Sequence, residues 1–116
     1  MTMKEIKAYI RPDRLAGIIS RLEAEGARDL TVTRVDAIGA LADAERDRLR
    51  LFRSYNEKYS DIAKVELVCT DAEVDRFAGV LREASCTGER GDGRIFVLNV
   101  ERAVNVRTGI EGDAAL

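Results

Sequence analysis

The chain has 116 residues, 46% of them hydrophobic, with 19 basic side chains, 21 acidic side chains and no histidine. This length fits one domain with one core. The formal net charge of −2 argues against general nucleic-acid affinity, which needs an excess of Lys and Arg. No apolar run approaches the ~20 residues of a membrane span, and the N-terminus lacks a signal-peptide core, so we expect a cytoplasmic protein without membrane insertion.

The first part of the chain predicts a strand, a helix and a second strand. Apolar residues alternate through residues 4–10, and Pro12 ends this strand because proline cannot continue a central ladder. A helix follows, with an apolar stripe at helical spacing that ends at Gly26. The stripe consists of Leu15, Ile18, Ile19 and Leu22. The second strand is expected over residues 30–35.

A long excursion, residues 40–61, separates this strand from the next. Loops beyond ~12–15 residues without structure are uncommon in compact domains unless they are functional or disordered. Its residues 41–53 favour a helix, and its aromatic side chains fall roughly on one helical face. Two interpretations remain open: a solvated loop that needs no partner, and a partner-binding arm.

The second part of the chain predicts a strand at 64–69, a helix and a last strand at 94–100. A capping box, Thr70 to Glu73, starts the helix. Its expected inner face consists of Val74, Phe77, Ala78 and Leu81. This order predicts an α+β, ferredoxin-like βαββαβ sandwich: an antiparallel sheet with two helices on one face. The open face, with apolar residues on both sides of the last strand, favours packing against other copies.

Cys69 and Cys86 are the two cysteines of the sequence, and they do not form a metal-binding spacing. Histidine, the commonest transition-metal ligand and the usual general base, is absent. We therefore expect no metal site, no Ser/His or Cys/His catalytic pair, and two reduced, buried, structural cysteines.

A glycine loop precedes the last strand, in the sequence TGERGDGRIF that starts at Thr87. Glycine backbone N–H groups can form an anion-binding concavity, and arginine adds bidentate contacts to phosphate. Arg94 begins the strand, and Arg107 lies near a second turn. The alternative is a plain turn between a helix and a strand.

This part of the chain resembles the C-terminal signature of the PII family of trimeric nitrogen-regulatory signal proteins. The residues that carry the resemblance are Thr87, Gly91 to Phe96 and the apolar run that follows. Residues 3–35 resemble the family's first strand, helix and second strand more weakly, and residues 40–62 depart from it. The resemblance implies one domain over residues 1–116 and a homotrimer. It also implies a partner-reaching T-loop at about 40–61, a phosphate-binding loop at 87–94 and a C-terminal loop at 105–116.

The resemblance further implies that ATP or ADP binds in clefts between subunits. Carried over by position, the nucleotide-binding residues are Thr31, Gly39, Val68, Gly91, Asp92, Gly93, Arg94, Asn105 and Arg107. The expected partner-contacting residues of the T-loop are Arg50, Phe52, Arg53, Tyr55 and Tyr59. Tyr55 and Ser54 are candidates for modification, but this segment lacks the family's uridylylation pattern, so we interpret Tyr55 as an unmodified contact residue.

Three departures from the family pattern affect the ligand. Asn105 replaces a phosphate-contacting arginine, and a hydrogen bond to a charged group is worth ~1.5–3 kcal/mol. Leu41 replaces a glutamine that helps to hold magnesium and 2-oxoglutarate, and Ile62 replaces a lysine that pairs with a 2-oxoglutarate carboxylate. An apolar pair cannot neutralise a dicarboxylate, so we expect no 2-oxoglutarate sensing.

The expected function is that of a non-enzymatic regulator that binds ADP, AMP or ATP and acts on a membrane transporter or a metabolic enzyme through its T-loop. One alternative is a slow nucleotide hydrolase in which Asp92 and Glu89 orient water. Another is a trimeric ferredoxin-like scaffold without nucleotide. The sequence leaves the physiological nucleotide and the target open.

Overall fold

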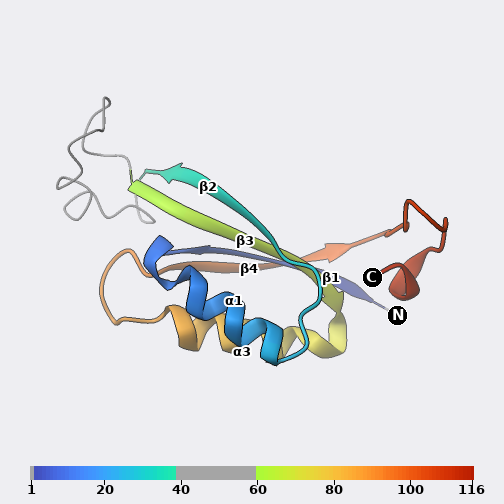
Figure 1. Ribbon diagram of the computed structural model, residues 1–116, viewed down its shortest axis with the longest axis horizontal. Helices are drawn as coiled ribbons and strands as arrows, with labels where there is room; N and C mark the ends of the chain where they lie inside the picture. Colours follow the sequence, from blue (N-terminus) through green and yellow to red (C-terminus); the bar gives the residue numbers. More distant parts are fainter. Residues whose placement is uncertain (1, 39–59) are drawn as a thin grey trace.

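The computed structural model of the chain describes residues 2–38 and 60–116 (Figure 1). Its four strands are β1 (Met3–Ile10), β2 (Thr31–Ala37), β3 (Ser60–Thr70) and β4 (Gly93–Val100). Its two α-helices are α1 (Leu15–Ala24) and α3 (Val74–Ser85). Short 3-10 turns span Pro12–Arg14, Asp71–Glu73 and Gly112–Ala115.

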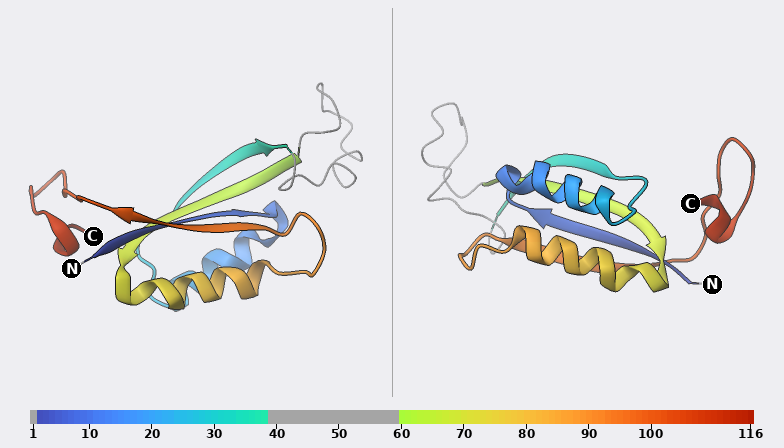
Figure 2. Two further views of the ribbon diagram at one scale, coloured as in Figure 1. Left: turned by 180° about the vertical axis from the view of Figure 1, so that it is seen from behind. Right: turned by 60° about the horizontal axis from the view of Figure 1, so that its bottom comes forward.

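The strands form one antiparallel sheet in the order β2-β3-β1-β4, and both helices cover the same face of it (Figures 1 and 2). This is the ferredoxin-like α+β arrangement that the sequence predicts. The edge strands are therefore β2 and β4, and no described residue forms a layer on the face away from the helices.

The core lies between the sheet and the two helices. Strand β1 is central because it pairs with both β3 and β4, and its helix-facing residues Ile6, Ala8 and Ile10 are at most 1% exposed. Helix α1 contributes Ile18 and Leu22 to this core. The contributions of α3 are the predicted Phe77 and Leu81 together with Val80, whereas the predicted Val74 and Ala78 are only half-buried.

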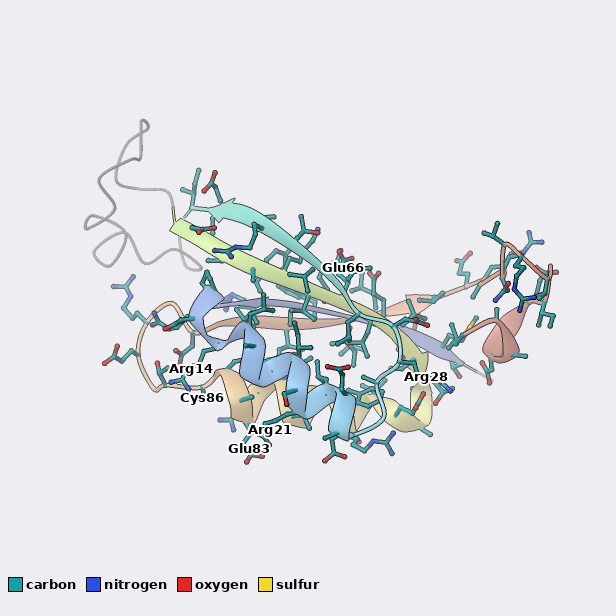
Figure 3. The ribbon with its side chains drawn as sticks, in the orientation of Figure 1. Arg14, Arg21, Arg28, Glu66, Glu83 and Cys86 are labelled. Atoms are coloured by element: carbon teal, nitrogen blue, oxygen red, sulfur yellow. The ribbon has the colours of Figure 1, made fainter. Side chains whose placement is uncertain are left out.

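A capping box precedes α3, and an ion pair joins α3 to α1. The predicted capping box is present: Thr70 and Glu73 satisfy each other's backbone N–H groups at the start of the turn that leads into α3. The Thr70 backbone N–H bond holds the pKa of Glu73 below its usual value. Arg21 of α1 and Glu83 of α3 approach to 3.4 Å across the helix pair (Figure 3). This pair is exposed and contributes little stability.

The hairpin of β2 and β3 is longer than predicted. Strand β2 continues to Ala37 and β3 begins at Ser60, with Asp36 opposite Asp61. Residues 60–61, which were expected to belong to the T-loop, are therefore strand. An ion pair of 2.8 Å between Arg34 and Asp61 joins the two strands and supports this extension, because it offsets the repulsion of facing carboxylates.

The prediction of two buried cysteines is wrong for Cys86. Cys69 is 2% exposed in β3, and burial raises the pKa of its thiol. Cys86 is exposed and unpaired (Figure 3). It follows the last residue of α3 with an extended backbone, and Ser85 takes the buried position instead.

The segment expected as a C-terminal loop, 105–116, is partly ordered by backbone bonds. Val104 and Glu111 form an isolated antiparallel bridge, and Asn105 N–H donates to the Ile110 carbonyl at 2.8 Å. The turn Gly112–Ala115 follows this small hairpin. The hairpin projects from the end of the sheet opposite to the loop that joins α3 to β4 (Figure 1).

Candidate functional site

The predicted phosphate loop, residues 87–94, leads from the C-terminal end of α3 into the edge strand β4, and its last two residues, Gly93 and Arg94, already belong to that strand. Three of its glycines have positive φ angles, 86° at Gly88, 89° at Gly91 and 116° at Gly93. L-residues with a side chain rarely adopt this conformation, so the glycines set the shape of the loop.

Gly93 has a second reason to be glycine. It pairs with Ile10 of β1, and a Cβ added to it would lie 1.7 Å from the Tyr9 carbonyl oxygen. The close approach of β4 to β1 therefore requires the absence of a side chain, whether or not a ligand binds.

Asp92 organises the loop from within. One carboxylate oxygen accepts hydrogen bonds from the backbone N–H groups of Thr87 and Gly88, at 2.8 and 2.9 Å. The other accepts from the Thr87 hydroxyl and from Arg11 Nε, the latter at 3.0 Å. A carboxylate has about four lone-pair sites, so these four donors occupy them all. Asp92 is therefore not available to orient an attacking water, which weakens the hydrolase alternative.

Arg11 is a site residue that the sequence analysis missed. It is 6% exposed, forms the ion pair with Asp92 and also donates from Nη2 to the Arg90 carbonyl. It thereby ties the loop to the end of β1. Its partner Asp92 is 81 positions away in the sequence, so no local pattern indicates the pair.

The ionisation of Asp92 follows from these contacts. Burial opposes the charged form, but the hydrogen bonds from Thr87, Arg11 and Gly88 outweigh burial and hold the pKa of Asp92 well below its usual value. The loop therefore keeps a fixed negative charge that is balanced by Arg11.

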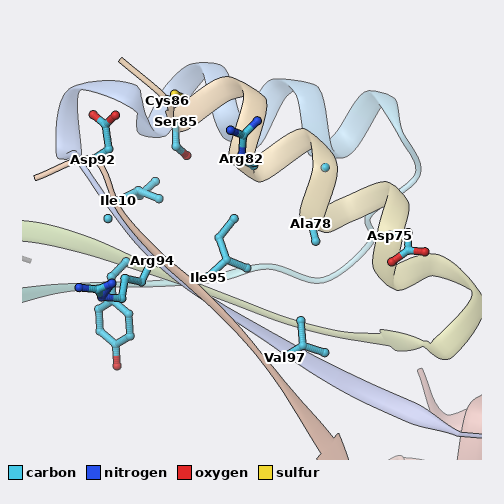
Figure 4. Close-up of a pocket in the computed structure, with 13 residues that line it drawn as sticks. Ile10, Asp75, Ala78, Arg82, Ser85, Cys86, Asp92, Arg94, Ile95 and Val97 are labelled. Carbon is cyan, nitrogen blue, oxygen red and sulfur yellow. The ribbon is translucent and has the colours of Figure 1, made fainter. Parts of the chain in front are cut away.

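A pocket of about 640 Å³ opens beside this loop, between α3 and β4 (Figure 4). Its volume lies within the range of small-molecule sites. Asp92, Gly93 and Arg94 line the end next to the loop. The Arg94 side chain is exposed, and Figure 4 shows it directed away from α3.

Thr31 and Val68 line a second pocket, of about 250 Å³, together with Glu66 and the C-terminal Leu116. Thr31 lies opposite Glu66 in the β2–β3 pair, and both Thr31 and Val68 are exposed. The structure thus brings the two residues that were predicted to line the adenine pocket to one place.

Asn105 has a structural task in the C-terminal hairpin. Its side-chain oxygen accepts from the backbone N–H groups of Arg107 and Thr108, at 3.0 and 3.1 Å. This side chain stabilises the tight turn that ends at Gly109, whose φ is 74°. Arg107 is exposed in the same turn.

One chain does not bring all predicted site residues together. Thr31 lies on edge strand β2 and Arg94 on edge strand β4, and three strand spacings of about 4.8 Å separate these edges by roughly 14 Å. The C-terminal hairpin, which contains Asn105 and Arg107, projects from the end of the sheet opposite to the phosphate loop (Figure 1).

Several predicted residues lie outside the described part of the chain. These are Gly39, Leu41, Arg50, Phe52, Arg53, Ser54, Tyr55 and Tyr59. Within residues 2–38 and 60–116, no cluster of three or more His, Cys, Asp or Glu side chains is arranged to hold a metal ion. No helix of the described segments is long and apolar enough to cross a membrane.

Comparison with known proteins gives a consistent match over nearly the whole chain. The family model "Nitrogen regulatory protein P-II" matches residues 3–110. Nitrogen regulatory protein GlnK2 of Haloferax mediterranei is 40% identical over 114 residues, covering 98% of this chain and 91% of that protein. Nitrogen regulatory protein P-II 1 of Escherichia coli is 34% identical and is covered over its full length, with 98% of this chain aligned.

Solved structures agree with the sequence matches. The GlnK–ATP complex of B. subtilis superposes with a TM-score of 0.80 at 28% identity, covering 99% of this chain and 96% of that chain. Arabidopsis thaliana PII bound to citrate gives a TM-score of 0.81 at 30% identity, covering 99% and 92%.

Proposed function

Because the chain belongs to the nitrogen regulatory protein P-II family, we propose that it is a signal-transduction protein that binds an adenine nucleotide between copies of itself. The nucleotide state controls the conformation of segment 40–61, and this segment contacts a target transporter or metabolic enzyme. A nucleotide that favours one conformer of the segment changes target affinity by the same coupling energy.

The observation that carries this proposal is the separation of the site residues over the two edges of one sheet. Thr31 and Val68 line a pocket toward β2, whereas Gly91 to Arg94 lie at the β4 edge. Within residues 2–38 and 60–116, no further strand pairs with either edge. When the β2 edge of one copy lies beside the β4 edge of the next, the two half-sites form one cleft. The proposed assembly is a homotrimer.

Only part of the phosphate loop has backbone N–H groups that can contact a phosphate. Hydrogen bonds inside the loop use the N–H groups of Thr87, Gly88 and Glu89. The proposed phosphate contacts therefore come from Gly91 to Arg94 and, in the adjacent copy, from Arg107. The relative solved with ATP supports an adenine nucleotide as the ligand class.

The base of segment 40–61 argues against a 2-oxoglutarate response. Ile62 is 3% exposed in β3, so an apolar side chain is buried at the position where a carboxylate of that ligand needs a cation. We expect 2-oxoglutarate to leave nucleotide affinity unchanged.

Calorimetry with ATP, ADP and AMP tests the proposal. Wild type should bind at least one of these nucleotides with micromolar or tighter affinity, and Arg94→Ala should weaken every phosphorylated ligand. Release of inorganic phosphate, measured in the same samples, should stay at the buffer rate. The absence of nucleotide binding would favour the scaffold alternative, and steady phosphate release would favour the hydrolase.

A further inference from the structure

The pocket between α3 and β4 extends well beyond the phosphate loop, and this extension has its own chemistry (Figure 4). Its floor is apolar, with Ile95 and Val97 of β4 facing Ala78 of α3. Its wall is one face of α3, since the lining residues recur at helical spacing. These wall residues are Asp75, Ala78, Gly79, Arg82 and Ser85, and Cys86, directly after the helix, continues the wall.

Gly79 makes this part of the pocket open. Glycine in the interior of a helix is destabilising relative to alanine, yet it stands in the middle of α3. A Cβ at this position would meet no atom within 4 Å. Neither strain nor close packing therefore requires glycine here, and a larger side chain would project into open space at the pocket wall.

Two polar groups at the loop end of the wall have no polar partner among the residues that the structure describes. Ser85 is 6% exposed, and its hydroxyl has no hydrogen-bond partner among the described residues. A buried, unsatisfied hydroxyl is costly, so an acceptor in the pocket would stabilise it. The Arg82 guanidinium, one helical turn away, forms no ion pair with any described residue. An unpaired cation beside an unsatisfied donor is suited to an anion.

The other charges along the pocket fix the orientation of that anion. Asp92 lies near the same end, but Arg11 already balances its charge. Asp75 lies at the far end of the wall, where it would repel a carboxylate (Figure 4). The acid group is therefore favoured at Arg82 and Ser85, with an apolar body on Ile95 and Val97.

We propose that the pocket between α3 and β4 binds a small amphipathic carboxylate, with its acid group at Arg82 and Ser85 and its apolar part along β4. This inference does not depend on nucleotide binding, because the groups that carry it lie on α3 and on the helix-facing side of β4. The ligand would add a second input to the same molecule, next to the phosphate loop.

Cys86 supplies a direct reporter of occupancy. Its exposed thiol lines the pocket, whereas the other cysteine is buried in the core. Modification of the full chain by N-ethylmaleimide, with Cys86→Ser as the blank, measures access to the pocket. Octanoate serves as the probe, octanol as the neutral control and acetate as the charged control without an apolar body. Each titration is run with and without saturating ADP.

Octanoate should slow the modification of Cys86 in a saturable way at millimolar concentration, with or without ADP, while octanol and acetate should protect much less. Arg82→Gln should weaken the binding of octanoate about tenfold. This is the low end of the range for a hydrogen bond to a charged group, because Arg82 is exposed. Gly79→Leu, which fills the pocket, should abolish protection. Gly17→Leu, at another helical glycine with open space, should not alter it.

Three results would overturn the proposal. The first is equal protection by octanol and octanoate, which would indicate only an apolar surface. The second is unchanged protection in Gly79→Leu, which would place the probe elsewhere. The third is a change of molar mass in Gly79→Leu by light scattering, which would show that another copy of the chain occupies the pocket.

Discussion

The contact between Arg11 and Asp92 shows how one residue pair determines the shape of the candidate site. Arg11 is buried at the end of a core strand, and its charge is balanced by a carboxylate that also holds two loop N–H groups. Removing one charge of a buried ion pair is more costly than replacing both partners by apolar groups. The loop and the core are thus coupled through one ion pair.

Asp92→Asn should destabilise the chain by about 1–3 kcal/mol, because it removes one charge of the Arg11–Asp92 ion pair and replaces an oxygen acceptor by a donor. Urea unfolding measures this change. Glu89→Gln removes a charge from the same loop, at an exposed side chain, and should leave stability within about 0.5 kcal/mol. Equal effects of the two variants would contradict the structural role of Asp92.

The same pair predicts a pH dependence. The pKa of Asp92 is lowered in the folded state from an ordinary value of 3.8, so the unfolded state binds the proton more readily. Stability from this group is complete above about pH 4 and is lost as the pH falls toward the lower, folded pKa. Between pH 5 and pH 3, wild type should therefore lose more free energy of unfolding than Asp92→Asn does. Parallel losses in the two proteins would contradict this assignment.

At the scale of elements, strand β4 depends on Gly93 more than on the other loop glycines. Gly93→Ala should cost at least about 2 kcal/mol, because a Cβ would overlap the Tyr9 carbonyl across the β1–β4 pair. Gly88→Ala has a similar positive φ but open space around it, so only the conformational cost of about 1–2 kcal/mol remains. Thermal unfolding of both variants measures the difference, and equal costs would rule out the strand-pairing role.

The elements themselves were largely predictable from local patterns. Alternation in residues 4–10 and the box from Thr70 to Glu73 correspond directly to β1 and to the start of α3. The errors occur where tertiary contacts determine the end of an element or the burial of a side chain. Strand β3 extends to Ser60 because β2 pairs with it, and Cys86 is exposed because α3 ends before it.

The candidate site was less predictable than the fold. The glycines and Arg94 stand out in the sequence, and the structure places them in the loop before β4 and in the first two residues of that strand. Arg11 does not stand out, because its contact is made by folding across the whole sheet. The turn contacts of Asn105 were also not predictable from the sequence, which does not indicate what its side chain contacts. The structure shows that its side-chain oxygen accepts hydrogen bonds from two backbone N–H groups.

At the scale of the whole molecule, the uncovered sheet face predicts an assembly. Phe96 and Leu98 of β4 point to this face and are 45% and 42% exposed in the single chain. Leu98→Lys should therefore break the proposed trimer into smaller species while leaving the fold of each chain intact. Light scattering and far-UV circular dichroism measure the two effects. Ser20→Lys, on the exposed surface of α1, should keep the trimer mass. A Leu98→Lys protein of unchanged mass would show that this face is not an interface.

We expect the nucleotide preference to depend on the proposed assembly, in which Asn105 and Arg107, which follow β4 in the chain, reach the phosphate loop of an adjacent copy. Asn105 provides no charge for a third phosphate, so ADP or AMP should bind at least as tightly as ATP. Asn105→Arg adds charge but also removes the two turn hydrogen bonds, each worth about 1 kcal/mol.

Asn105→Ala separates these effects, because it removes the same turn contacts without adding charge. The ratio of ATP to ADP affinity, measured by calorimetry, should be about tenfold higher in Asn105→Arg than in Asn105→Ala, as expected when one charged hydrogen bond is gained. If both variants keep the wild-type ratio, residue 105 does not face the terminal phosphate. If wild type already binds ATP tenfold more tightly than ADP, a residue other than Asn105 must supply the positive charge for the third phosphate. Arg107→Ala tests whether Arg107 supplies this charge.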